Sequence, residues 1–150
     1  MRIRTFNLLV VIVLLSIGIT SCKKPIGQAQ RDLEQEYLSK YIAKYNPTVA
    51  AKSSGLYYIE TKTPAATDSL IKKGDVVKVF YGGHLIENNA TTGIGIVPTP
   101  FDSSGVFEPF TFTVGAGSVI TGWDEAMTYM SDHGEAKLII PSKLAYSGQA

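Results

Sequence analysis

The chain has 150 residues, of which 45% are hydrophobic, 18% charged and 10% aromatic, as expected for one folded domain with a short appendage. A formal net charge of +1, with no basic patch interleaved with aromatic residues, argues against a nucleic-acid partner. Two histidines and one cysteine are too few for a usual zinc site without several carboxylates, and a single cysteine excludes a disulfide within the chain.

Residues 1–21 have the pattern of a signal peptide. Arg2 and Arg4 form a positive start, and the apolar run from Leu8 to Ile19 is shorter than the roughly 20 residues that a membrane-spanning helix needs. The sequence Ile19-Thr20-Ser21-Cys22 resembles the lipobox of bacterial lipoproteins, in which the cysteine receives lipid. We therefore expect lipid on Cys22 to anchor the chain in the bacterial cell envelope, facing the periplasm or on the outer membrane. A secreted protein with a free thiol and a retained membrane helix are the alternatives.

Residues 22–53 are predicted to contain the lipidated cysteine, a polar tether over Lys23–Gln28 and one amphipathic helix from Gln30 to Tyr45. The helix is indicated by apolar side chains at helical spacing, and Asn46-Pro47 ends the pattern. This stripe consists of Leu33, Tyr37, Leu38, Tyr41, Ile42 and Tyr45. We expect the stripe to pack on the following domain. A contact face for an envelope protein or for a second copy of the chain is the alternative.

The remainder of the chain alternates between short strands and turns. β-branched and aromatic residues, or apolar and polar alternation, predict strands at Leu56–Glu60, Val76–Tyr81, Phe110–Val114 and Ala136–Ile140. A short helix is predicted over Trp123–Met130, and Asn88–Pro100 is predicted to be a loop. The fold class is therefore α+β, an antiparallel sheet with one short helix against it.

Six blocks of sequence, in order, resemble FKBP-type peptidyl-prolyl cis–trans isomerases. They are Gly74–Gly83, Phe101–Ser104, Pro109–Gly115, Val119–Glu125 with its Val-Ile-x-Gly-Trp sequence, the group formed by Met130 and Gly134–Ile140, and Ala145-Tyr146. The resemblance implies an FKBP-like isomerase domain over residues 54–150, with an antiparallel sheet wrapped on the short helix.

The same resemblance implies an apolar pocket that takes a proline ring, with Trp123 as its floor. The implied catalytic residues are Asp102, Tyr146 and Tyr81. The implied substrate-binding residues are Trp123, Phe110, Phe112, Val119, Ile120 and Phe101. In the family, the position of Ile120 offers its backbone N–H to a substrate carbonyl, that of Tyr146 is a hydroxyl donor at the rim, and that of Asp102 faces the twisting amide. Phe101 and Phe112 are expected to close the edge of the pocket.

The resemblance implies a peptidyl-prolyl cis–trans isomerase that assists the folding of exported or envelope proteins by acting on proline-containing polypeptides. Such a reaction breaks no bond, so no cofactor and no metal are expected. The alternative is a non-catalytic binding module or chaperone in an envelope complex for motility or secretion, since lipoproteins resembling this one accompany bacterial surface motility machinery.

The sequence departs from the family pattern at two places, an insertion and its C-terminal end. An insertion at Asn88–Pro100 lies beside the implied pocket, and we expect it to narrow the choice of substrate. Family domains continue past the equivalent of Ala145-Tyr146 through a loop and a final strand, so we expect this sequence to be a fragment of a longer protein or the product of a truncated reading frame.

Overall fold

The computed structural model describes residues 26–146. The predicted signal peptide, the lipidation site at Cys22 and the first part of the tether lie outside the described residues. Within residues 26–146, no helix is both long and apolar enough to span a bilayer.

The described elements confirm an α+β fold with an N-terminal helix, antiparallel strands and a short second helix. In chain order they are α1 (Ile26–Tyr45), β1 (Tyr57–Lys62), β2 (Val76–Val79), β3 (Gly82–Gly83), β4 (Ile86–Asn89), β5 (Gly93–Ile96), β6 (Asp102–Ser103), β7 (Phe110–Thr113), α2 (Thr121–Met127), β8 (Glu135–Ile139) and the 3₁₀ helix η1 (Ser142–Leu144). The strands pair antiparallel as β1 with β8, β2 with β7, β3 with β6 and β4 with β5.

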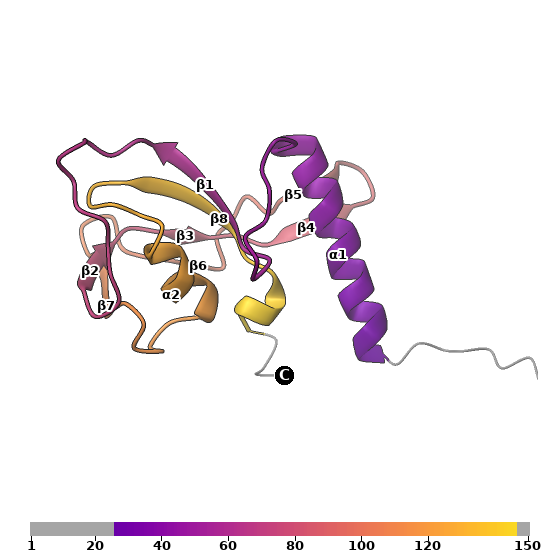
Figure 1. The fold of residues 1–150 in the computed structure, drawn as a ribbon. Helices are drawn as coiled ribbons and strands as arrows, with labels where there is room; N and C mark the ends of the chain where they lie inside the picture. The colour runs from indigo at the N-terminus through magenta and orange to yellow at the C-terminus, as the bar shows by residue number, and fades with distance from the viewer. Residues whose placement is uncertain (1–25, 147–150) are drawn as a thin grey trace, which may run out of the picture.

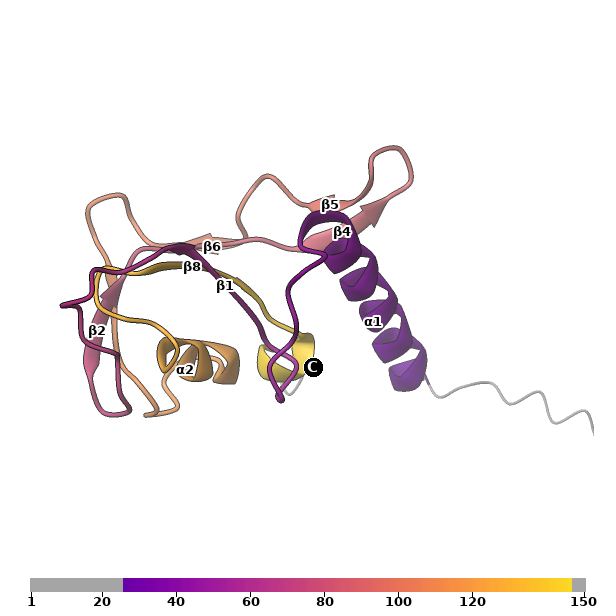
Figure 2. The ribbon, with the colours of Figure 1, turned by 45° about the horizontal axis from the view of Figure 1, so that its top comes forward.

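The two helices lie at different ends of the structure. In Figures 1 and 2, β1 and β8 run side by side over α2, whereas α1 lies beside the β4–β5 hairpin, away from α2. Each end has its own buried cluster. The α1 cluster consists of Tyr41, Ile42, Ile94 and Ile139, and the α2 cluster consists of Phe112, Val114 and Met127.

The amphipathic stripe of α1 packs largely on the domain, as we expected. Tyr41 and Ile42 are buried, and Tyr37 and Leu38 pack against the α1 cluster. Leu33 is exposed on the same helix. The helix begins at Ile26 rather than at Gln30, so the end of the predicted tether is helical.

The prediction of a loop over residues 88–100 is wrong for its first part, which completes the β4–β5 hairpin. The turn is stabilised by Asn89, whose side-chain oxygen accepts hydrogen bonds from the backbone N–H groups of Thr91 and Thr92. Gly93 has a φ of 72°, a left-handed conformation that glycine adopts without strain. Glycines at alternate positions of β5 conceal the strand in the sequence, because they break the apolar pattern.

The predicted single sheet is divided into two-stranded pairs in the part of the chain that the structure describes. Within residues 26–146, β2 hydrogen-bonds only to β7 and β8 only to β1. Both β2 and β8 line one cavity of about 2080 Å³, which also extends to Trp123 and α1. The two free strand edges therefore border the same space as the candidate site.

Candidate functional site

Helix α2 brings Trp123 to the cavity in its first turn. The carboxylate of Asp124 accepts hydrogen bonds from the backbone N–H groups of Gly115 (2.8 Å) and Gly117 (3.1 Å), which ties the loop after β7 to the start of α2. A Cβ atom on Gly122 would lie 2.6 Å from Cγ2 of Ile140, so only glycine lets α2 approach the end of β8 this closely. Trp123 is thus held at a fixed place between the two segments.

Three aromatic side chains surround the Trp123 ring, two from β7 and one, Tyr81, from the segment between β2 and β3. The ring centroid of Trp123 lies 4.7 Å from that of Tyr81, 6.1 Å from that of Phe110 and 5.8 Å from that of Phe112. The first two contacts are edge-on, an arrangement that aromatic quadrupoles favour. Tyr81 and Phe110 are also in edge contact with each other, at 6.2 Å.

Phe112 differs from its expected place at the pocket edge. Its side chain is only 6% exposed, and it belongs to the α2 cluster rather than to the lining of the cavity. Phe110 and Phe112 lie on the same face of β7, but Phe110 is 41% exposed, whereas Phe112 clusters with Val114 and Met127 of α2. Phe112 therefore supports Trp123 from within the core.

A tyrosine–carboxylate pair forms the polar side of the site. The hydroxyl of Tyr81 donates a hydrogen bond of 2.7 Å to the carboxylate of Asp102. This hydrogen bond, together with partial burial and the Asp102 charge, raises the pKa of Tyr81 above its ordinary value. The backbone holds the pair in register, because β3 and β6 pair Gly83 with Asp102 and the N–H of Tyr81 donates to Oγ of Ser104.

The other predicted residues line the cavity around this pair. Phe101 and Tyr146 meet edge-on with ring centroids 6.3 Å apart, and both are about half exposed. Val119 and Ile120 are partly buried at the start of α2. The backbone N–H of Ile120 makes no hydrogen bond to another described residue, so it remains available as a donor. The structure therefore brings Tyr81, Asp102, Phe101, Phe110, Val119, Ile120, Trp123 and Tyr146 to one cavity.

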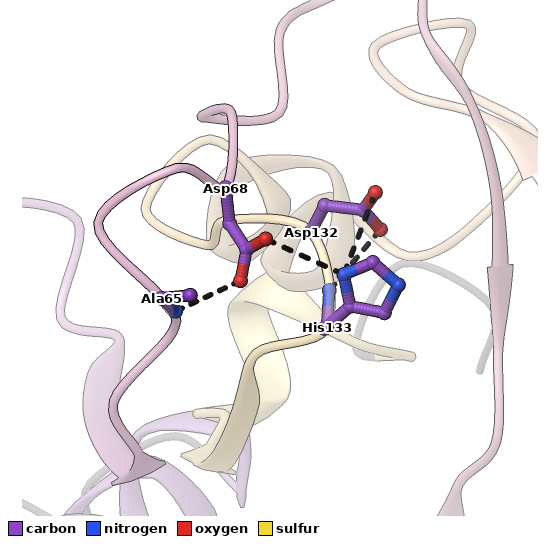
Figure 3. Close-up of polar contacts among 4 residues, drawn as sticks. All are labelled: Ala65, Asp68, Asp132 and His133. Carbon is purple, nitrogen blue, oxygen red and sulfur yellow. Dashed lines mark hydrogen bonds and ion pairs between the residues drawn. The ribbon is translucent and has the colours of Figure 1, made fainter.

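A second polar cluster lies at the turn before β8 (Figure 3). Nδ1 of His133 is 3.6 Å from Oδ1 of Asp68 and 3.8 Å from Oδ2 of Asp132, and Asp68 also accepts a hydrogen bond from the N–H of Ala65. His133 has a φ of 58° and its side chain is 73% exposed. These contacts join two adjoining turns. Within residues 26–146, no group of three or more acidic, histidine or cysteine side chains is arranged to hold a metal ion.

Sequence reasoning did not assign a role to Glu34 or Ser142, which join α1 to the segment that carries Tyr146. No signal in the sequence marks this pair, because the two residues come from opposite ends of the chain and neither belongs to a motif.

Comparison with known proteins confirms the family that the sequence resembles. The family described as FKBP-type peptidyl-prolyl cis-trans isomerase matches residues 67–150. The peptidyl-prolyl cis-trans isomerase FPR2 of Saccharomyces cerevisiae is 37% identical over 109 residues, which cover 71% of this chain and 74% of that protein. The peptidyl-prolyl cis-trans isomerase FKBP2 of Mus musculus is 40% identical over 76 residues, which cover 50% of this chain and 47% of that protein.

The crystal structure of a peptidyl-prolyl cis-trans isomerase from Pseudomonas syringae pv. tomato superimposes with a TM-score of 0.57 at 27% identity. That match covers 82% of this chain and 79% of the solved chain. In contrast, this chain spans about half the length of the mammalian relatives that it matches.

Proposed function

The chain belongs to the family of FKBP-type peptidyl-prolyl cis-trans isomerases, and from that premise we propose that it catalyses the cis–trans isomerisation of X–Pro bonds in polypeptides. The observation that supports this function best is the aromatic cavity around Trp123 with the Tyr81–Asp102 pair at its side. The cavity offers apolar surface for a proline ring and polar groups for the flanking peptide.

The proposed mechanism needs no covalent intermediate. Uncatalysed X–Pro isomerisation takes tens to hundreds of seconds, because twisting the amide costs about 18–20 kcal/mol of lost resonance. The planar amide is more dipolar than the twisted one, so an aromatic, water-poor cavity disfavours the planar form relative to the transition state. The side chains around Trp123 would supply this environment.

Hydrogen bonds on either side of the rotating bond would fix the substrate. The N–H of Ile120, which has no partner within the described residues, and the hydroxyl of Tyr146 would donate to substrate carbonyl groups, and the carboxylate of Asp102 would face the twisting amide. These donors bind the flanking peptide and so place the X–Pro bond in the aromatic cavity. Tyr81 acts by orienting Asp102, because its hydroxyl already donates to that carboxylate.

The direct test is the rate of prolyl isomerisation in a short peptide that contains Phe-Pro. We expect the purified chain to accelerate the reaction, and a macrolide ligand of the family to block the acceleration. Circular dichroism of the same sample checks that the chain is folded. A folded chain that binds the peptide without acceleration would support the alternative, a binding module, and would contradict catalysis.

The variant Asp102→Ala/Tyr146→Phe separates catalysis from simple holding of a client. We expect it to lose most isomerase activity while it still suppresses aggregation of an unfolded protein. Changes in the exposed part of the α1 stripe, at Leu33, should leave the isomerase activity unchanged. Loss of both activities in either variant would contradict this division.

We further propose that the protein is lipid-anchored through Cys22 in the bacterial envelope, where it assists exported proteins. The support is the positive start, the short apolar run and the cysteine that follows small residues. Cells that express the wild-type chain should incorporate labelled palmitate into it, and the Cys22→Ser variant should remain unlabelled and be released from membranes. Equal labelling of both proteins would contradict the proposal.

We also propose that the working domain contains one more strand between β2 and β8. The support is that, within residues 26–146, both strands have an edge without a partner strand along the same cavity, since unpaired edges are an aggregation risk that native sheets cover. The intact mass of the protein purified from its own cells tests this. A mature chain that ends at Ala150 would contradict it.

A further inference from the structure

Helix α1 is joined to the rim of the site by two hydrogen bonds on one carboxylate. Oε1 of Glu34 accepts from the backbone N–H of Ser142, and Oε2 accepts from the hydroxyl of Ser142, both at 2.5 Å. Hydrogen bonds to an ionised carboxylate are about twice as strong as neutral ones. The N-terminal helix is thus fixed to η1, a segment that follows β8 at the opposite end of the chain.

Glu34 supplies the capping acceptor that the local sequence of η1 lacks. The first N–H groups of a helical turn have no partner within the turn. Pro141 occupies the N-cap position of η1 and makes no side-chain capping hydrogen bond. Glu34 therefore satisfies the N–H of Ser142 from a different element, which fixes where η1 begins.

The η1 helix in turn borders the site on two sides. The carbonyl oxygen of Leu144 would lie 3.3 Å from a Cβ atom on Gly122, the residue before Trp123. Tyr146 follows η1 by two residues, and its ring meets Phe101 at the cavity. A shift of η1 would therefore move the hydroxyl of Tyr146 relative to Trp123.

We propose that Glu34 is a positioning residue for the reaction: by holding Ser142 at the start of η1, it places the Tyr146 hydroxyl where it can donate to the substrate carbonyl. This inference rests on the proposed isomerase function. Glu34 itself does not touch the substrate. Helix α1 thereby becomes part of the active unit rather than a spacer before it.

The test compares Glu34→Ala with Tyr146→Phe in the purified full chain, using a short Phe-Pro peptide. When a donor binds the ground state and the transition state equally, its loss raises KM and leaves kcat unchanged. We expect both variants to raise KM by on the order of tenfold, since small misplacements at a site have effects of this size or larger. The double variant should be no worse than Tyr146→Phe, because both changes remove the same interaction.

Two further variants serve as controls. Tyr45→Phe removes another contact of α1 with the domain, the hydrogen bond of 3.2 Å from the Tyr45 hydroxyl to the carbonyl of Ile94. It should leave KM unchanged, because Ile94 is not part of η1. Glu34→Gln keeps one acceptor oxygen, so its KM should lie between those of the wild type and Glu34→Ala. If Glu34→Ala does not fold, the KM of Glu34→Gln should still exceed that of the wild type.

The outcomes separate this inference from the proposed function. If Glu34 had a merely structural role, Glu34→Ala would lower the folded fraction, and kcat would then fall at unchanged KM. Alternatively, the effects of Glu34→Ala and Tyr146→Phe would multiply in the double variant. Either result overturns the inference. Wild-type activity with an unaltered KM in Glu34→Ala overturns this inference alone. A wild-type chain that neither isomerises the peptide nor changes its Trp123 fluorescence on adding it overturns both.

Discussion

At the scale of single residues, the Tyr81–Asp102 hydrogen bond makes the free energy of unfolding depend on pH in the alkaline range. The bond raises the pKa of Tyr81 above its ordinary value of 10.0, so the folded state holds this proton more tightly than the unfolded state does. Its contribution is therefore fully present below about pH 10 and is lost as the pH rises through the raised pKa.

We expect Tyr81→Phe to lower the free energy of unfolding by about 1 kcal/mol near neutral pH, the usual size for one hydrogen bond. Urea denaturation of both proteins from about pH 7 to about pH 11 checks this, and their difference should shrink only at the alkaline end. Tyr58 and Tyr129, whose pKa values are also raised, are present in both proteins and cancel in the difference. A difference that stays constant over the whole range would contradict the assignment.

Gly122 is a second residue at which the structure determines whether a substitution raises or lowers stability. Alanine in place of glycine stabilises an ordinary helix by about 1 kcal/mol. At this position its Cβ would lie 2.6 Å from Cγ2 of Ile140 and 3.3 Å from the Leu144 carbonyl oxygen. Overpacking of that kind costs about 1–3 kcal/mol, so we expect Gly122→Ala to be destabilising overall and to weaken peptide binding by moving Trp123.

Thermal unfolding with peptide titration measures both effects of Gly122→Ala. The matched control is Gly27→Ala in α1, where the nearest atom to the new Cβ would be Nη1 of Arg31 at 3.6 Å. This control should be neutral or slightly stabilising. Gly122→Ala with raised stability and unchanged binding would show that α2 has room that the structure does not indicate.

At the scale of elements, the β4–β5 hairpin and α1 stabilise one another. Ile94 in β5 is 8% exposed and packs with Tyr41 and Ile42, and its carbonyl accepts hydrogen bonds from Lys44 and Tyr45. The insertion thus has a packing role, while its proposed influence on substrate choice stays a prediction.

Ile94→Ala should therefore destabilise the docking of α1 by about 2–5 kcal/mol, the range for a large-to-small change in a core. Ile96→Ala is the control, because Ile96 is 41% exposed on the same strand, and it should change stability by about 0.5 kcal/mol or less. Amide hydrogen exchange in α1 measures the difference. Equal exchange in the two variants would mean that the hairpin does not hold the helix.

Some of these elements could be predicted from the sequence, whereas their depth and long-range contacts could not. The 3.6-residue stripe predicted α1 and its packing, and the alternation of Phe110 and Phe112 with threonines predicted β7. The same alternation did not reveal how deep each ring lies, because depth depends on α2, which packs against β7 from another part of the chain. Likewise the Glu34–Ser142 contact is long-range and carries no local signal.

At the scale of the whole molecule, two buried clusters divide the described residues. The α1 cluster unites α1, the hairpin and Ile139 of β8, whereas the α2 cluster unites β7, Val114 and Met127 of α2. No buried residue belongs to both clusters among the residues that the structure describes. The contacts between the two ends run through β8, η1 with Glu34, and the segment around β1, where Ser54 donates a hydrogen bond to Glu125 and Tyr58 meets Tyr129 edge-on.

This arrangement predicts that the two ends open separately below the global unfolding transition. Ile42→Ala should speed amide exchange in α1, β4 and β5 and leave α2, β2 and β7 protected, because Ile42 packs only in the α1 cluster. Met127→Ala should do the reverse, and in addition weaken peptide binding, because Met127 lies in the cluster that supports Trp123. Native-state hydrogen exchange followed segment by segment measures both variants. If either substitution speeds exchange equally throughout residues 26–146, the two clusters form one cooperative unit, and α1 is then coupled to the site by the whole core rather than through η1.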